Sequence, residues 1–115
     1  MKENKLVDLS MDFAIKIIKL CETIKGHYSL VNQLERSATS IGANIREAQY
    51  AHGKADFIAK LQIALKEANE TGYWLELLFK TNYMSEEEYK VLDSACTSLR
   101  IVLIASINTA KENGK

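Results

Sequence analysis

The side chains in this sequence that could hold a metal or attack a substrate are two cysteines, two histidines and several glutamates. Cys21 and Cys96 lie far apart in apolar segments, without the Cys-x-x-Cys or Cys/His spacing that binds zinc or forms a redox pair. Neither His27 nor His52 follows a glutamate at the Glu-x-x-His spacing of di-iron bundles. We therefore predict no metal site and interpret both cysteines as structural thiols.

Catalysis by other routes would also leave a signature. Nucleophilic catalysis would need Ser or Cys at a sharp strand-to-helix turn, and phosphate binding would need a glycine-rich loop before a helix; neither pattern occurs. Glu47, Glu67 and Glu70 on their own are weak evidence for a metal or for acid–base chemistry. The sequence therefore predicts no catalytic residue and no cofactor.

Arginines are the remaining candidates for recognising a partner. Several acidic and basic residues are spaced as helix-surface ion pairs, with the acid four residues before the base. These pairs are Asp12–Lys16, Asp56–Lys60, Glu76–Lys80 and Glu86–Lys90. Arg36, Arg46 and Arg100 have no acid at that spacing. We select Arg36 and Arg46 as candidate contacts to nucleic acid, with Arg46 the best single candidate for an intermolecular contact.

The composition places these residues in one small globular domain, residues 1–115. Hydrophobic residues make up 47% and charged residues 26% of the chain. The 15 basic residues equal the 15 acidic ones, which argues mildly against nucleic acid as the main partner. We see no secretory signal and no apolar run long enough to span a membrane, and we expect a cytoplasmic protein.

Apolar residues recur at spacings of three and four over residues 6–24, 30–48, 57–79 and 89–103, which predicts four amphipathic helices. Gly26 suits a helix end, Ser29 is expected to cap the second helix, and Ser85 with Glu88 forms a capping box for the fourth. We expect residues 111–115 to fray. On the first helix a second apolar row indicates contact with more than one neighbour. It comprises Met11, Ala14, Ile18 and Cys21.

No strand alternation or hairpin signal is present. The fold class is therefore all-α, and four stripes joined by short turns predict an antiparallel up-down four-helix bundle. On the third helix we expect Phe57, Leu61, Leu65, Ala68, Gly72, Leu75 and Phe79 to face the core. The small residues Ala38, Gly42, Ala68 and Gly72 would let helix backbones approach closely.

Two segments, ERSATSIGANIREAQ and DFIAKLQIALKEANETGYWLELL, resemble the four-helix bundle proteins encoded within 23S rRNA intervening sequences. The resemblance covers the second and third helices, about half of the chain. Many members of that family carry proline where this chain has Gly42. Both residues weaken a helix, so we expect a bend there, with Ser40 and Asn44 satisfying the backbone groups that it frees.

The resemblance implies a homopentamer without established enzymatic activity. The chain is also similar to the accessory proteins of diversity-generating retroelements, which work with a reverse transcriptase and nucleic acid. The leading hypothesis is a non-enzymatic oligomeric bundle, and the alternative is an accessory module that binds RNA or a nucleic-acid enzyme. An unrecognised enzyme is third.

Two polar or mixed surfaces are candidate sites. Gln33, Arg36, Ser40, Asn44 and Glu47 form a polar stripe, which is either a ligand or partner site or, as we favour, a hydrogen-bonded strip along a bundle seam or a subunit contact. On the third helix a face outside the expected core predicts a subunit interface. It comprises Ile63, Glu67, Glu70, Trp74, Leu77 and Leu78. The alternative is that Trp74 completes the bundle core.

Overall fold

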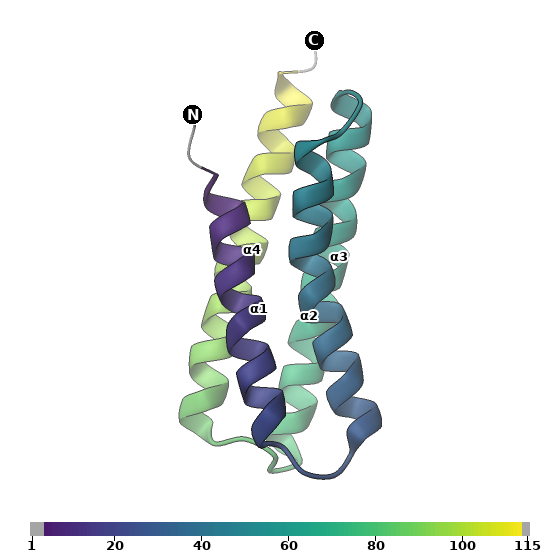
Figure 1. Ribbon diagram of the computed structural model, residues 1–115. Coiled ribbons are helices and arrows are strands. Elements are labelled where there is room, and N and C mark those ends of the chain that lie inside the picture. The colour runs from purple at the N-terminus through teal and green to yellow at the C-terminus, as the bar shows by residue number, and fades with distance from the viewer. Residues whose placement is uncertain (1–3, 114–115) are drawn as a thin grey trace.

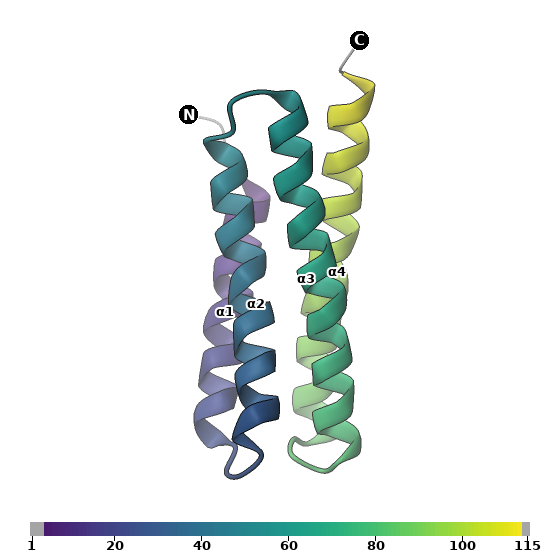
Figure 2. The same ribbon diagram turned by 90° about the vertical axis from the view of Figure 1, so that its right-hand side faces the viewer.

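The computed structural model describes residues 4–113, and that part of the chain contains four α-helices and no strand. They are α1 (Lys5–Thr23), α2 (Tyr28–Gln49), α3 (Lys54–Lys80) and α4 (Glu86–Glu112). The helices run alternately up and down and lie side by side in an elongated body of 49 × 24 × 22 Å (Figures 1 and 2). The predicted all-α four-helix bundle is confirmed. Of the tail expected to fray, Lys111 and Glu112 belong to α4, and residues 114–115 lie outside the described part.

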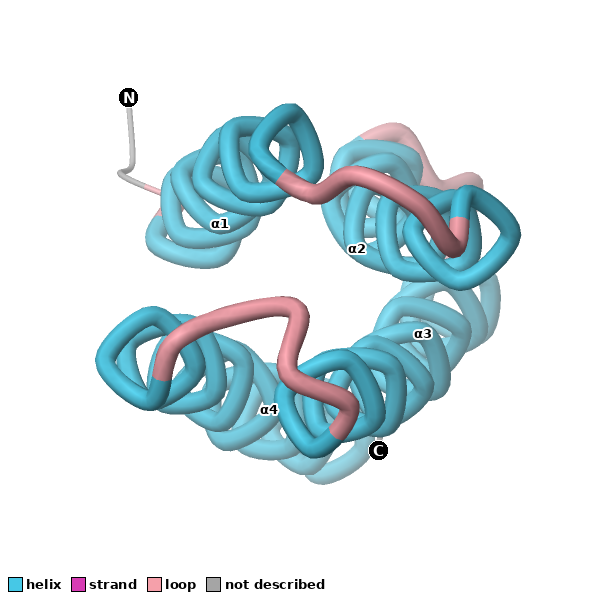
Figure 3. Tube along the Cα trace, turned by 90° about the horizontal axis from the view of Figure 1, so that it is seen from below, coloured by secondary structure: helices cyan, strands magenta, loops and turns pink. Residues whose placement is uncertain are grey.

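Each helix packs against its two neighbours around one shared core, in the cyclic order α1–α2–α3–α4 (Figure 3). The contact between α2 and α3 is the most extensive, and that between α1 and α4 is the least. Large apolar side chains from all four helices, including Phe13, Ile41, Leu75 and Leu103, are almost completely buried between them. α1 and α4 are therefore attached to the rest of the bundle less extensively than α2 and α3.

The core face of α3 is only partly the one predicted. Leu61, Ala68 and Leu75 are fully buried as expected, whereas the predicted core residues Phe57, Leu65 and Phe79 are only half-buried. Three residues not assigned to the core, Ala64, Thr71 and Leu78, are fully buried instead. Thr71 can occupy the core because its hydroxyl donates to Ser37 Oγ, 2.9 Å away on α2.

The start of α4 is capped as predicted, whereas the start of α2 is not. Ser85 and Glu88 form the predicted capping box, with reciprocal bonds of 3.0 and 2.9 Å. Ser29, however, is not a cap, because α2 begins at Tyr28 and His27 is its N-cap residue. His27 has φ 47° and its side chain makes no capping bond. This left-handed conformation follows Gly26, which has φ 90°, so the second helix begins two residues earlier than expected.

The two helical glycines occupy different environments. A Cβ on Gly42 would lie 3.3 Å from Ser10 Oγ of α1, which is tighter than ordinary contact, so close approach explains this glycine. A Cβ on Gly72 would have no neighbour within 4 Å, so the predicted close approach there is wrong.

α2 continues through Gly42 as one helix. Ser40 Oγ donates to the Arg36 carbonyl, and Asn44 Nδ2 donates to the Ser40 carbonyl. A proline at position 42 would free the carbonyl of Ala38, the i−4 acceptor, which neither side chain contacts in this way. Ser40 and Asn44 were expected to satisfy the backbone groups that a bend at Gly42 frees, and these two bonds do not do so.

By length and composition α4 is apolar enough to span a membrane. The prediction that no apolar run is long enough to do so is therefore wrong by this criterion. This is weak evidence, since a core helix of a bundle meets the same test. Leu92, Leu99 and Leu103 of α4 are buried in the core, and Asp93 and Arg100 interrupt its apolar sequence.

Candidate functional site

The predicted polar stripe of α2 lies along the seam with α3, and Arg36 joins the two helices. Arg36 Nη2 donates to Glu70 Oε1 at 2.7 Å, and Nη1 lies 3.5 Å from Glu67 Oε1. The structure therefore brings together Arg36 from the stripe with Glu67 and Glu70, which were assigned to a separate surface. Neither of the two predicted surfaces included this pairing. It depends on how α2 and α3 are rotated about their own axes relative to each other.

The electrostatics of this cluster stabilise its charged form. Desolvation raises the pKa of Glu70, but hydrogen bonds from Arg36 and contacts with Glu67, together with the charge of Arg36, outweigh it and hold the pKa below its usual value. The hydrogen bond to Glu70 raises the pKa of Arg36. Because about half of the Arg36 side chain is exposed, the pair stays in contact with water. Arg36 thus already forms ion pairs within the chain. It is therefore a poorer candidate for a contact to nucleic acid than the sequence alone indicated.

The next members of the stripe along α2, Ser40 and Asn44, are half-buried. Ser40 and Asn44 bond to backbone carbonyls of their own helix, at 2.8 and 2.9 Å. Glu47 is exposed and makes no ion pair within residues 4–113. For Arg36 the arrangement matches the favoured interpretation, a hydrogen-bonded strip along a seam. For Glu47 the structure shows no bond of this kind.

The predicted subunit interface on α3 is largely used inside the chain. Leu78 is fully buried, so its assignment to an outer surface is wrong. Trp74 is half-buried and packs against the core, which favours the alternative that it completes the bundle. Among the described residues its buried Nε1 has no hydrogen-bond partner. Ile63 is 42% exposed and Leu77 is partly exposed, so these two remain available to a partner.

Both cysteines have the properties of structural thiols. Burial, with a smaller contribution from Glu35, raises the pKa of Cys21 to about 11. Burial is also the main cause that raises the pKa of Cys96 to about 11, against an opposing effect of Arg100. The Cys96 thiol donates to the Ala68 carbonyl at 3.3 Å. Both thiols are protonated near neutral pH and are therefore poor nucleophiles.

The structure adds a surface that the sequence indicated only in part. Met11, Ile15 and Ile18 of α1 are exposed by 46%, 45% and 38%. Met11 and Ile18 belong to the second apolar row noted in the sequence, whereas Ile15 was missed because it lies one step beyond that row. On α4, Ile101 and Ile104 are also exposed. In the described part of the chain no three His, Cys, Asp or Glu side chains gather closely enough to hold a metal ion.

These features define an all-α bundle whose polar side chains reinforce its seams and whose outer helices carry exposed apolar residues. The chain belongs to the 23S rRNA-intervening sequence protein family, whose model matches residues 2–105. It is similar to a solved structure from Bacteroides thetaiotaomicron, described as a protein of unknown function from the S23 ribosomal protein family. The two are 47% identical with a TM-score of 0.84, over 89% of this chain and 97% of the other. No curated protein matches the chain.

Proposed function

We propose that this protein is a non-enzymatic bundle that acts as a homo-oligomer, a homopentamer as the family resemblance implies. The observation that carries the proposal is the set of large apolar side chains left outside a complete core on α3 and α4, which include Ile63, Val91, Ile101 and Ile104. Contiguous exposed apolar surface is typical of protein interfaces. Glu67 and Glu70, two of the three glutamates considered for acid–base chemistry, instead pair with Arg36 along the α2–α3 seam.

Light scattering coupled to gel filtration tests the assembly at micromolar concentration. The expected mass is five times that of the 13.0 kDa chain. A monomer mass at this concentration would rule out the oligomer. A mass of ten chains would indicate two rings joined together, and any other multiple would overturn the pentamer while leaving a homo-oligomer.

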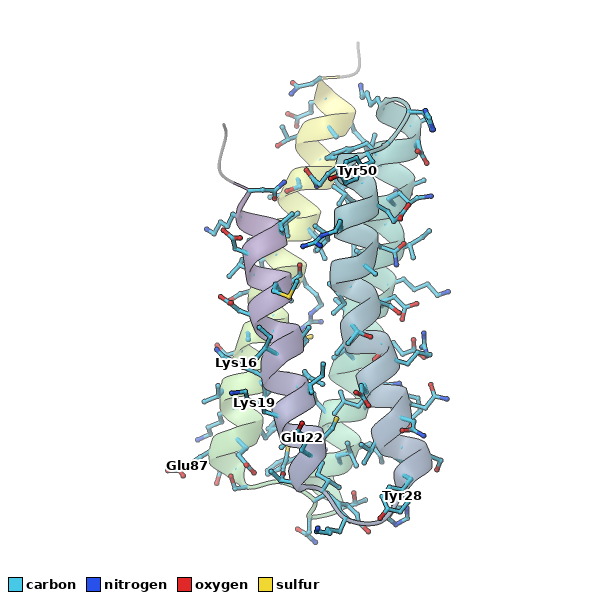
Figure 4. All side chains as sticks on the ribbon, viewed as in Figure 1. Lys16, Lys19, Glu22, Tyr28, Tyr50 and Glu87 are labelled. Carbon is cyan, nitrogen blue, oxygen red and sulfur yellow. The ribbon has the colours of Figure 1, made fainter. Side chains whose placement is uncertain are left out.

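A second candidate function is nucleic-acid binding, alone or with an enzyme that handles RNA. It is favoured by Arg46, which makes no ion pair within residues 4–113, and by Tyr50, which is 80% exposed directly after the end of α2 (Figure 4). An exposed aromatic ring can stack on a base while a guanidinium contacts phosphate. His52 and Lys54 follow at the same end of the bundle.

Fluorescence anisotropy with a labelled single-stranded RNA tests this candidate at about 50 and 200 mM salt. Binding through several phosphates should weaken steeply with salt. Arg46→Ala should weaken it further, whereas Arg36→Ala is the matched control because Arg36 already pairs with Glu67 and Glu70. Tight binding that is insensitive to salt and to Arg46→Ala would contradict an electrostatic site at this end.

A further inference from the structure

We propose that the outer face of α1 binds a second copy of this chain, with the two α1 helices antiparallel about a twofold axis. The face is one continuous row of α1 at helical spacing, hereafter the α1 row. Its members are Met11, Ile15, Ile18 and Glu22. All four are exposed, so three adjacent apolar residues end in one carboxylate at the lower end of α1.

A groove between α1 and α2 continues the apolar surface beside this row. Val7, Met11, Ala14 and Ile18 line it from α1, and Thr39, Gly42, Ala43 and Arg46 line it from α2. Gly42 leaves space at the bottom of the groove, because it has no side chain where α2 faces Ser10. Among the described residues that line the groove, Arg46 alone is charged, and it lies near the C-terminal end of α2, which is the upper end in Figure 1.

The charged side chains around the α1 row make no ion pair within the described part of the chain. Three of the four ion pairs predicted from the sequence form, at Asp56–Lys60, Glu76–Lys80 and Glu86–Lys90. The fourth, Asp12–Lys16 on α1, does not form. Within residues 4–113 no ion pair involves Lys19, Glu22 or Arg46 either. This face therefore carries both signs of charge without an ion pair in the described residues, although Lys19 shares a groove with Glu87 and Glu88 of α4.

The positions of these charges make the face complementary to itself. Gly42 lies opposite Ser10, so Arg46, one turn further along α2, lies near the level of Val7. At about 1.5 Å per residue, Arg46 is roughly 12 Å above Ile15 and Glu22 is roughly 11 Å below it. A twofold axis at Ile15 therefore brings Arg46 of each copy to the level of Glu22 of the other.

The same operation pairs a second set of charges. Asp12 lies three residues before Ile15 and Lys19 lies four residues after it, on the same flank of α1. Antiparallel pairing at Ile15 places Asp12 of one copy beside Lys19 of the other. Figure 4 views the face formed by α1 and α2, with Lys19 at the side of α1 and Glu22 near its lower end. Four ion pairs would then flank an apolar centre built from two α1 rows, the usual arrangement of a protein interface.

This pairing goes beyond the proposed pentamer and does not depend on it. A five-membered ring uses two different faces of each subunit, whereas this face meets its own copy. A membrane or an acidic partner would favour one sign of charge, and this face carries both. A second copy is therefore the occupant that its chemistry fits.

Charge exchange tests the pairing directly. In Arg46→Glu or Glu22→Arg protein, like charges meet at both ends of the interface, and we expect the dissociation constant from sedimentation to rise at least about tenfold. The double variant Arg46→Glu/Glu22→Arg restores the opposite charges and should recover most of the affinity. Circular dichroism melts establish that each variant is folded. Single variants that associate as the unchanged protein does, or a double variant no better than the singles, would overturn the pairing.

Crosslinking tests the symmetry. In a Cys21→Ala background, Ile15→Cys lies on the twofold axis, so mild oxidation should join two copies through one disulfide. Lys16→Cys is the matched control, because its side chain points about 100° further round the helix. Equal crosslinking of the two variants would contradict the proposal. A pentamer unaffected by the charge variants would overturn the pairing and leave the ring, whereas a dimer sensitive to them would overturn the ring and leave the pairing.

Discussion

Gly42 and Gly72 show how one residue type can serve different purposes within neighbouring helices. Both glycines interrupt long apolar patterns, and each costs its helix about 1 kcal/mol relative to alanine. At Gly42 the glycine leaves room for Ser10 of α1, which lies where a Cβ would make a tight contact. The Ser10 side chain is buried and donates to the Val7 carbonyl at 3.1 Å. At Gly72 the surrounding space is open, so no packing contact accounts for the glycine.

The two glycines should therefore respond differently to alanine. We expect Gly72→Ala to stabilise the protein by up to about 1 kcal/mol, because alanine is the better helix former and meets no atom. Gly42→Ala should be less favourable by about 1 kcal/mol or more, because its methyl group must displace Ser10 Oγ. Repeating Gly42→Ala in a Ser10→Ala background should recover most of this difference in a double-mutant cycle. Urea denaturation measures all of these free energies, and equal effects of the two alanines would refute the close approach.

At the scale of the element, the ends of the helices determine where each one begins. The Ser85 hydroxyl accepts from the Glu88 N–H, and the Glu88 carboxylate accepts from the Ser85 N–H. We expect Ser85→Ala to cost about 1 kcal/mol of unfolding free energy. Ser98→Ala, an exposed site on the same helix, is the control and should change little. A cost at Ser85 no greater than that at Ser98 would show that the start of α4 is fixed by packing alone.

The sequence was sufficient for those elements whose signals are local. Four amphipathic stripes predicted the four helices, and the spacing of Ser85 and Glu88 predicted the cap of α4. His27 was missed as the start of α2 because its left-handed backbone has no signature in side-chain pattern. The pairing of Arg36 with Glu67 and Glu70 was missed because it depends on the rotation of α2 against α3, which local spacing does not determine.

At the scale of the whole molecule, the packing is uneven around the bundle. α2 and α3 share the most extensive contact, while α1 is the shortest helix at 19 residues and makes little contact with α4. The same helix carries Met11, Ile15 and Ile18 on its outer face. The apolar surface that α1 leaves outside the core is therefore available to stabilise it from outside, through the second copy proposed above.

Hydrogen exchange should reveal this unevenness. Local openings have free energies that rise with the extent of buried contact, so we expect amides of α1 near Phe13 and Ile17 to exchange at least about tenfold faster than those of α2 and α3. Exchange measured by mass spectrometry at increasing protein concentration should then slow in α1 more than in α3, because association covers α1 directly. The Arg46→Glu variant is the control, since its α1 should stay fast over the same range. Uniform protection of all four helices at low concentration would instead indicate that the bundle opens only as a single cooperative unit, and α1 would then have no separate stability for a partner to increase.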